Sequence, residues 1–171
     1  YGIYDINLNN GFVNVGIDHN TSEFAVESIR QWWNNIGKKN YPNAKELLIF
    51  ADGGGSNASR SRLWKFYLQR FANKTGLKIT VCHFPPGTSK WNKIEHKMFS
   101  FISMNWRGKP LINYEVIINL IEGTKTKKGL KIKAKMDKRI YELGKKVLEE
   151  DFKKINLKEH SINSKWNYTI G

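Results

Sequence analysis

Alternating hydrophobic and polar positions divide the first part of the chain into short elements. Residues 1–17 form two alternating runs on either side of Asn9-Asn10-Gly11, which predicts a β-hairpin with its turn at that tripeptide. A helix is predicted from about Asn20 to Gly37, because a capping sequence precedes an apolar stripe and a glycine follows it. The stripe consists of Ala25, Ile29, Trp32, Trp33 and Ile36.

Two apolar runs and two further helical patterns come next. Residues 47–51 are continuously apolar, which is typical of a strand in the middle of a sheet that is covered on both faces. Residues 58–75 predict a helix that closes at Gly76, residues 77–84 a second strand, and residues 89–105 a third helix. The order hairpin, helix, strand, helix, strand, helix predicts an α/β sheet with helices packed on it.

The last third of the chain has a different composition. After a short predicted helix at 114–122, six lysines fall within residues 125–135 with no acidic residue among them. Apolar residues alternate with these lysines from Leu130 to Met136, so an edge strand or an extended arm is expected. We therefore expect a core in residues 1–122 and a basic C-terminal extension, residues 123–171, packed on or beside it.

Charge narrows the range of partners. The 171 residues include 29 Lys and Arg against 15 Asp and Glu, a formal net charge of +14, and nucleic acid is the partner that such a balance most often serves. A membrane surface is the competing partner, but the sequence has neither a long basic amphipathic helix nor an apolar stretch of about 20 residues. Cys82 is the only cysteine, which excludes a disulfide framework and a zinc cluster.

Two acidic residues occupy positions that suit a catalytic or metal-binding role. Asp52 ends the predicted strand 47–51, and Glu95 lies near the start of the third helix, where helical spacing places it inside an apolar arc. Each has a simpler explanation: Asp before glycines is a common turn, and Asn92 with Glu95 fits a capping box. Reactive groups in open α/β sheets gather at the carboxyl ends of strands, so Asp52 and Glu95 converge if their strands are neighbours.

Converging carboxylates in a basic protein are most simply neutralised by Mg²⁺. Two such ions held by acidic side chains are a standard arrangement for in-line displacement at phosphorus. The glycines after Asp52 loosely match a dinucleotide-binding fingerprint, but Val81-Cys82-His83 stands where that fingerprint needs an acidic residue, and no Walker lysine follows. We therefore expect the glycines to let the backbone bend closely beside Asp52.

Basic and aromatic residues near these motifs are candidates for contacts with DNA. Lys90 and Lys93 flank Trp91 and can contact phosphate, although a solvated helix start beside a core tryptophan explains them equally well. The dense lysine run after Gly123 is the better candidate, with Lys125, Lys127, Lys128 and Lys131. His83 and His96 flank the predicted site, and we expect His96 to face solvent or DNA.

Several longer motifs resemble one family of transposases. They are residues 51–57, Ala-Asp-Gly-Gly-Gly-Ser-Asn; residues 83–96, His-Phe-Pro-Pro-Gly-Thr-Ser-Lys-Trp-Asn-Lys-Ile-Glu-His; residues 106–110, Trp-Arg-Gly-Lys-Pro; and residues 166–170, Trp-Asn-Tyr-Thr-Ile. This set resembles the DDE transposases of bacterial insertion sequences in the Rhodopirellula-type family, over nearly the whole chain.

The resemblance implies an RNase H-like mixed sheet flanked by helices, as in mariner-type transposases and retroviral integrases, with an Asp, Asp, Glu metal site. Asp52 matches the second carboxylate and Glu95 the third. The implied activity is DNA strand cleavage by water followed by strand transfer, with two Mg²⁺ ions for which Mn²⁺ can substitute. The implied partners are the transposon terminal repeats, target DNA and further copies of the chain, in the bacterial cytoplasm at the nucleoid.

The chain departs from this pattern at its start. An RNase H-like core begins with three antiparallel strands and carries its first catalytic Asp on the first of them, whereas here only a hairpin precedes the first helix. We expect this strand and its Asp to lie upstream of Tyr1, with Asp5 as the fallback ligand and Asp18 as a turn or cap residue. The competing functions are a non-catalytic DNA-binding module and an RNase H-like nuclease without strand transfer.

Overall fold

The structure is a computed structural model that describes residues 1–171, apart from the side chain of Ser89. Strands β1 (Gly2–Asp5) and β2 (Asn10–Gly16) form the predicted antiparallel hairpin. Its turn lies earlier than predicted, because Asp5 pairs with Asn10 and the Asp5 carboxylate accepts hydrogen bonds from the backbone N–H groups of the loop. Gly11 lies within the ladder, where a Cβ atom would meet Sδ of Met98 at 2.4 Å.

The first helical segment has the predicted apolar stripe. Helix α1 (Ser22–Trp32) is capped by Thr21, whose side chain accepts from the Phe24 N–H, and all five stripe residues are buried. A π-helical turn η1 (Trp33–Gly37) and α2 (Lys38–Asn40) continue it. Gly37 therefore does not end the helix as predicted; its missing side chain instead makes room for the Trp33 ring, which a Cβ atom would meet at 2.5 Å.

Two parallel strands and the helix between them carry the first motif. β3 (Glu46–Ala51) pairs in parallel with β4 (Lys78–His83). Between them lie a 3-10 turn η2 (Gly55–Asn57) and helix α3 (Arg62–Thr75), which ends at the left-handed Gly76 and begins four residues later than predicted, at the Ser61 cap.

The second motif begins a helical segment that changes its geometry along its length. A 3-10 turn η3 (Ser89–Trp91) is followed by a π-helical turn η4 (Glu95–Phe99) and by α4 (Ser100–Trp106). Helix α5 (Tyr114–Glu122) has the predicted bounds.

The C-terminal third supplies strands to both sheets. β5 (Lys131–Asp137) is an edge strand parallel to β2, with its lysines exposed and Ile132 buried, as the alternation predicted. After the short helix α6 (Glu149–Lys153), β6 (Leu157–Glu159) pairs with β7 (Asn167–Ile170), which pairs with β4. The extension is thus joined by hydrogen bonds to strands of the preceding 122 residues.

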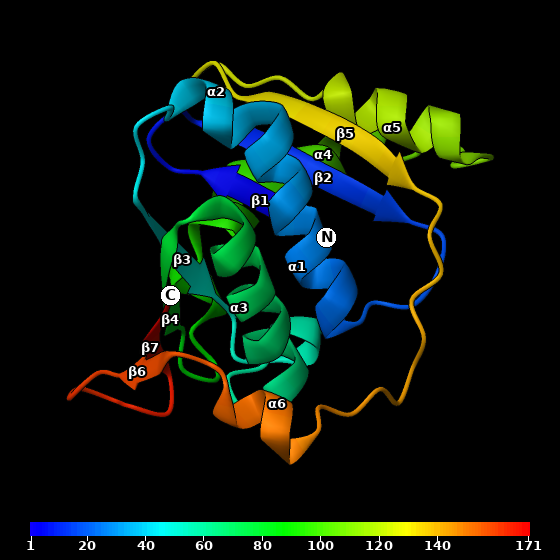
Figure 1. Cartoon of the computed structure of the whole chain (residues 1–171). Coiled ribbons are helices and arrows are strands. Elements are labelled where there is room, and N and C mark those ends of the chain that lie inside the picture. Colours follow the sequence, from blue (N-terminus) through cyan, green and yellow to red (C-terminus); the bar gives the residue numbers. More distant parts are fainter.

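The strands form two sheets, ordered β1-β2-β5 and β3-β4-β7-β6. Figure 1 shows α1 and α3 on the near side of the strands, while α4 lies behind β1 and β2 and α5 lies along β5. Each side has its own core: Phe12 belongs to the cluster under α1 and α3, and Val13 to the cluster under α4 and α5. The mixed, helix-flanked α/β fold is consistent with the RNase H-like fold that the resemblance implies.

One face of the second sheet is open. Leu48 and Phe50 on β3 are 54% and 49% exposed, so the prediction that residues 47–51 are covered on both faces was wrong. The physical reason is that α4 and α5 cover the first sheet: α5 packs on β2 and β5, and the core cluster of α4 and α5 contains no β3 residue. In the part of the chain that the structure describes, no helix is both long and apolar enough to cross a membrane.

Candidate active site

Asp52 lies directly after β3 with its side chain exposed at the carboxyl end of the strand. The side chain of Asn57 is buried and points toward Asp52. Its Nδ2 donates to the Asp52 carbonyl oxygen at 3.0 Å and to the Asp52 carboxylate Oδ1 at 2.5 Å. The carboxylate is therefore held in one orientation while its other oxygen stays available to solvent or a ligand.

The glycine loop after Asp52 is exposed, but its two ends lie close to neighbouring backbone. A Cβ atom on Gly53 would lie 3.3 Å from the Phe84 carbonyl oxygen, and Gly55 has a φ of +60°, in the left-handed region that favours glycine. Ser22 at the start of α1 donates to the carbonyl oxygen of Ser56 at 2.6 Å. These contacts support the prediction that the glycines allow a close backbone bend beside Asp52.

A buried chain of hydrogen bonds connects Asp52 to the core of the second sheet. His83 Nδ1 lies 3.1 Å from the Asp52 carbonyl oxygen, His83 Nε2 lies 3.0 Å from the Tyr168 hydroxyl, and Trp64 Nε1 donates to that hydroxyl at 2.8 Å. A carbonyl oxygen can only accept, so Nδ1 carries the proton and Nε2 accepts from Tyr168. Both ring nitrogens of His83 then have a partner, and the Asp52 carbonyl oxygen accepts from His83 as well as from Asn57.

The electrostatics agree with this neutral arrangement. Burial is the largest influence on His83 and lowers its pKa, which keeps the imidazole uncharged. Burial likewise raises the pKa of the Tyr168 phenol, which keeps the hydroxyl as a donor. These hydrogen bonds between Trp64, Tyr168 and His83 therefore support the backbone that carries Asp52.

Glu95 has a different environment. It is exposed, and the π-helical turn that it begins has no side-chain cap, so among the described side chains the alternative of a capping box with Asn92 is not formed. The prediction that Glu95 points into the apolar arc was wrong. A π-helical turn rotates successive residues by less than about 100°, which shifts the face of the helix that Glu95 occupies. Only Met98 and Ile102 are buried among the residues of the predicted arc, which are Trp91, Ile94, Met98, Phe101 and Ile102.

The start of β1 contacts the helical segment that follows Glu95 and is also affected by the charge of Asp52. Met98 and Phe99, one turn after Glu95, pack so closely on Gly2 that a Cβ atom there would lie within 3 Å of both side chains. Tyr1, the neighbour of Gly2, has a phenol whose pKa is raised by burial and by the charge of Asp52. The start of β1 is thus close to Asp52 and also to the helical segment that follows Glu95.

The donor atoms suit a magnesium or manganese ion in kind, since both predicted ligands offer hard carboxylate oxygens. Within the described part of the chain, no group of three or more His, Cys, Asp or Glu side chains is arranged to hold a metal ion. Asp52 and Glu95 stay predicted ligands on the basis of their donor atoms.

Asp5 and Asp18 have structural partners. Asp5 is 8% exposed and accepts from two loop N–H groups and from the Tyr41 hydroxyl. Asp5 is the last residue of β1, whereas the charge of Asp52 raises the pKa of Tyr1, just before the first residue of that strand. Asp18 accepts from the backbone N–H of Tyr141.

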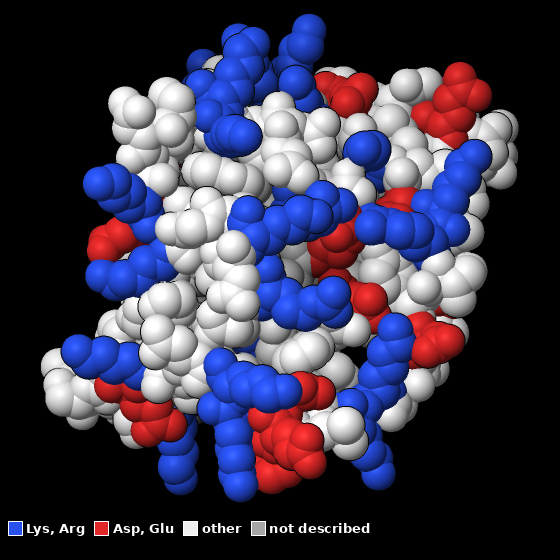
Figure 2. Space-filling model, in the orientation of Figure 1, with Lys and Arg blue, Asp and Glu red and all other residues white. Residues whose placement is uncertain are grey.

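The predicted DNA-contacting lysines fall into two groups. Lys90 and Lys93 are exposed beside Trp91, with Lys90 Nζ 5.9 Å from the centre of its ring, and Trp91 is 60% exposed rather than part of the core. The others are exposed on the loop before β5 and at its first residue: Lys125, Lys127, Lys128 and Lys131. Figure 2 shows basic side chains spread over the visible face, with smaller acidic groups between them.

Sequence reasoning missed the supporting residues of the site. Asn57, Tyr168 and Trp64 were within or near the quoted motifs, but no role followed from their spacing. The available signal was a polar residue at the end of the glycine run and a tyrosine at an inward position of the closing strand, both of which need a buried partner.

Comparison with known proteins agrees with the motifs. Residues 1–171 match the family described as the Rhodopirellula transposase DDE domain. No curated protein and no solved structure shows a significant match. Because the match spans the entire chain, the chain belongs to the Rhodopirellula transposase DDE domain family.

Proposed function

We propose that this chain is a transposase catalytic domain that cleaves DNA at transposon ends with water and then joins the freed 3′-hydroxyl to target DNA. The observation that carries the proposal is the fixed, exposed carboxylate of Asp52 at the carboxyl end of β3. The Phe84 N–H donates to the Ala51 carbonyl oxygen, so the loop toward Glu95 leaves the sheet beside Asp52.

Asp52 and Glu95 are the residues that would hold the metal. Mg²⁺ ions, when bound, supply activation of the attacking oxygen and stabilisation of the leaving oxygen in an in-line displacement. The chain's own contribution is positioning: Asn57 and the His83 chain orient Asp52, while the exposed lysines hold DNA phosphates near the site.

A third carboxylate belongs on a strand between β1 and β3. Each of these strands pairs on one side only, β1 with β2 and β3 with β4. We infer that they run antiparallel to each other. Tyr41, before β3, donates to Asp5 at the end of β1, while the charge of Asp52, after β3, raises the pKa of Tyr1 just before β1. A strand parallel to β3 would use both open edges and unite the two sheets.

The position of this strand fits the chemistry. Its carboxyl end would lie beside Asp52 and Tyr1, so an Asp near that end completes the ligand set and a short turn leads into β1. This is the proposed location of the first catalytic Asp, and it leaves Asp5 in its structural role.

The test is cleavage and strand transfer on a labelled transposon end, with a protein that contains the additional strand. Asp52→Asn and Glu95→Gln are each expected to reduce both reactions at least about a hundredfold in Mg²⁺ or Mn²⁺, because each removes a metal ligand. Glu142→Gln, a matched change at an exposed carboxylate, is expected to have no effect. Activity that survives either of the first two substitutions would show the assignment to be wrong.

Residues 1–171 alone provide the complementary test. They are expected to bind Mn²⁺ weakly and to give no robust cleavage, because Asp52 and Glu95 are two of the three carboxylates that the proposed site needs. Robust metal-dependent transposition by this fragment would contradict the proposed strand and would assign the third carboxylate within the chain, with Asp5 the first to be substituted.

A further inference from the structure

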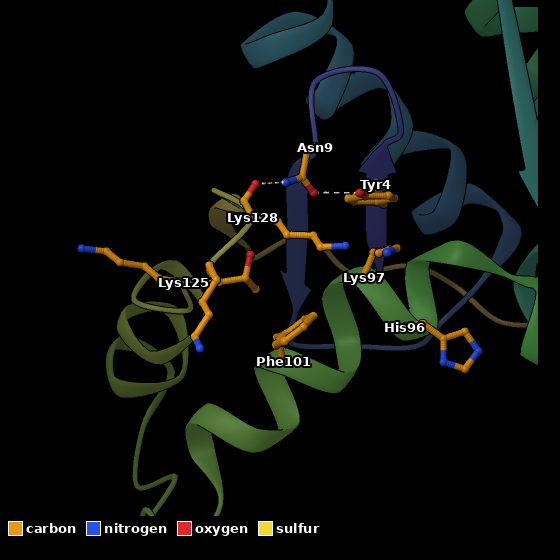
Figure 3. A pocket seen from close by; sticks show the side chains of 9 residues that line it. Tyr4, Asn9, His96, Lys97, Phe101, Lys125 and Lys128 are labelled. Carbon is orange, nitrogen blue, oxygen red and sulfur yellow. Dashed lines mark hydrogen bonds between the residues drawn. The ribbon is translucent and has the colours of Figure 1, made fainter.

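A basic cavity begins one residue away from Glu95. It has a volume of about 620 Å³ and lies between the β1–β2 hairpin, the helical segment that follows Glu95, and the loop before β5. His96, the neighbour of Glu95, lines it, and its size is within the range of small-ligand sites. Figure 3 shows that its lining comes from segments far apart in the sequence.

The charged side chains that line the cavity are all basic. Lys97 lines it from the helical side, and Lys125, Lys127 and Lys128 line it from the loop, with no acidic residue among the lining side chains. The rings of Tyr4 and Phe101 also contribute to its walls. Ammonium groups bind phosphates, and aromatic rings stack on nucleobases without requiring a particular sequence.

The walls are held in place before any ligand arrives. The Tyr4 hydroxyl donates to Asn9 Oδ1 at 2.8 Å, and Asn9 Nδ2 donates to the Lys128 carbonyl oxygen at 2.8 Å, which ties the hairpin to the lysine loop (Figure 3). Thr124, 1% exposed, anchors the start of the loop through its hydroxyl to the Leu120 carbonyl oxygen. A pre-formed wall reduces the entropy lost on binding.

We infer that this cavity binds a single-stranded DNA segment next to the phosphodiester that reacts at Asp52 and Glu95, with a base stacked on Tyr4 or Phe101. The inference rests on the proposed function for the position of that phosphodiester. Phe101 lies six residues after Glu95 in the same helical segment, at most about 9 Å at the α-helical rise of about 1.5 Å per residue, so the cavity lies within about two to three nucleotides of the proposed metal ligand.

The experiment measures the affinity of fluorescent single-stranded DNA for the chain, by anisotropy without metal. Tyr4→Leu and Phe101→Leu are expected to weaken binding about fivefold or more, the lower range for loss of one stacked base. Tyr4→Phe keeps the ring but loses the hydrogen bond to Asn9, so it is expected to weaken binding clearly less than Tyr4→Leu does. Phe66→Leu is the matched control, since Phe66 is a half-buried aromatic residue on α3.

The charge is tested by paired substitutions. Lys125→Gln with Lys128→Gln is expected to reduce the slope of log affinity against log salt by about 1.4, from about 0.7 for each phosphate contact on a single strand. Lys153→Gln with Lys158→Gln removes the same charge from exposed positions on α6 and β6 and is expected to leave the slope unchanged. Circular dichroism and thermal unfolding establish that each variant is folded.

Three results would overturn the inference: equal weakening by the control variants, equal weakening by Tyr4→Phe and Tyr4→Leu, or the same dependence on Phe101 for duplex DNA. These results are independent of catalysis. If cleavage requires both carboxylates while Phe101→Leu binds single strands normally, the cavity inference alone fails. If the cavity variants behave as expected while cleavage survives loss of Asp52 or Glu95, the proposed function alone fails.

Discussion

The two sheets each contain a buried polar network, and the networks differ in charge and in what they support. In the β1-β2-β5 sheet, the Asp137 carboxylate accepts from Arg139, Tyr141 and Asn14, and the group is charged. In the β3-β4-β7-β6 sheet, Trp64, Tyr168 and His83 form a neutral chain that ends at Asp52. Only the second network reaches a candidate catalytic residue.

This difference explains why the two carboxylates are so unlike. Asp52 belongs to the second sheet and is oriented by its network. Glu95 is positioned by the first sheet, because its helical segment packs on Gly2 and Gly11 through Met98. The side chain of Glu95 itself is exposed. The candidate site therefore spans the boundary between the sheets, where the proposed additional strand would join them.

The largest effect is expected from the centre of the neutral network. Trp64 is 0% exposed, so Trp64→Ala removes a large buried side chain and the donor to Tyr168. The free energy of unfolding is expected to fall by about 3–5 kcal/mol. Trp91→Ala, at a ring 60% exposed on the Glu95 side, is expected to change it by less than about 0.5 kcal/mol. Urea unfolding followed by circular dichroism measures both, and similar losses would remove the contrast between the two sides.

An intermediate effect is expected from the charged network. Asp137 is 3% exposed, and Asp137→Asn leaves buried donors without an anionic partner, at a cost of about 2–4 kcal/mol near neutral pH. Burial opposes ionisation of Asp137, but the hydrogen bonds from Arg139 and Tyr141 outweigh it, and the pKa is lowered.

The lowered pKa fixes the direction of the pH dependence. The unfolded state takes up a proton at Asp137 at a higher pH than the folded state does, so its stabilisation is present above the unfolded pKa of about 3.9 and is lost as the pH falls below it. In Asp137→Asn this acid-dependent loss is expected to be absent. Urea unfolding between about pH 3 and about pH 7 measures it, and an unchanged acid slope would assign the dependence to other groups.

The alternation of residues predicted the elements well because it reports which side of each element is buried. The α1 stripe, the bounds of α5 and the edge strand β5 all follow from local periodicity. Asp52 at the end of a strand was likewise predicted from the apolar run before it. Local sequence carries this information because each of these elements is covered by a neighbour in the expected way.

The predictions were wrong at positions whose structure depends on contacts with distant parts of the chain. Gly11 and Gly37 were interpreted as turn and helix-end signals, but each makes room for a side chain from elsewhere or from a preceding turn. The exposure of Phe50 depends on where α4 packs, and that of Glu95 on a π-helical turn that no periodicity indicates. The partners of Asp52 come from positions up to 31 residues away along the chain, so spacing alone could not assign them.

The smallest of the three effects is the most informative about the site. Tyr168→Phe removes only the hydroxyl between Trp64 Nε1 and His83 Nε2, and the two unpaired buried groups are expected to cost about 1–3 kcal/mol in unfolding free energy. Because His83 supports the backbone of Asp52, Mn²⁺ affinity is also expected to fall, by about tenfold, the lower end of the range for partners of metal ligands. Tyr114→Phe, at an exposed phenol on α5, is the matched control and is expected to change neither quantity.

The asymmetry between the two carboxylates gives this prediction a sharper form. If the network acts through Asp52, the loss of Mn²⁺ affinity caused by Tyr168→Phe persists in a Glu95→Gln background and disappears in an Asp52→Asn background. Electron paramagnetic resonance of free Mn²⁺ measures the affinities. A loss that persists in the Asp52→Asn background would mean that the hydroxyl acts on the metal site by general destabilisation, and the neutral network would then be a feature of the core alone.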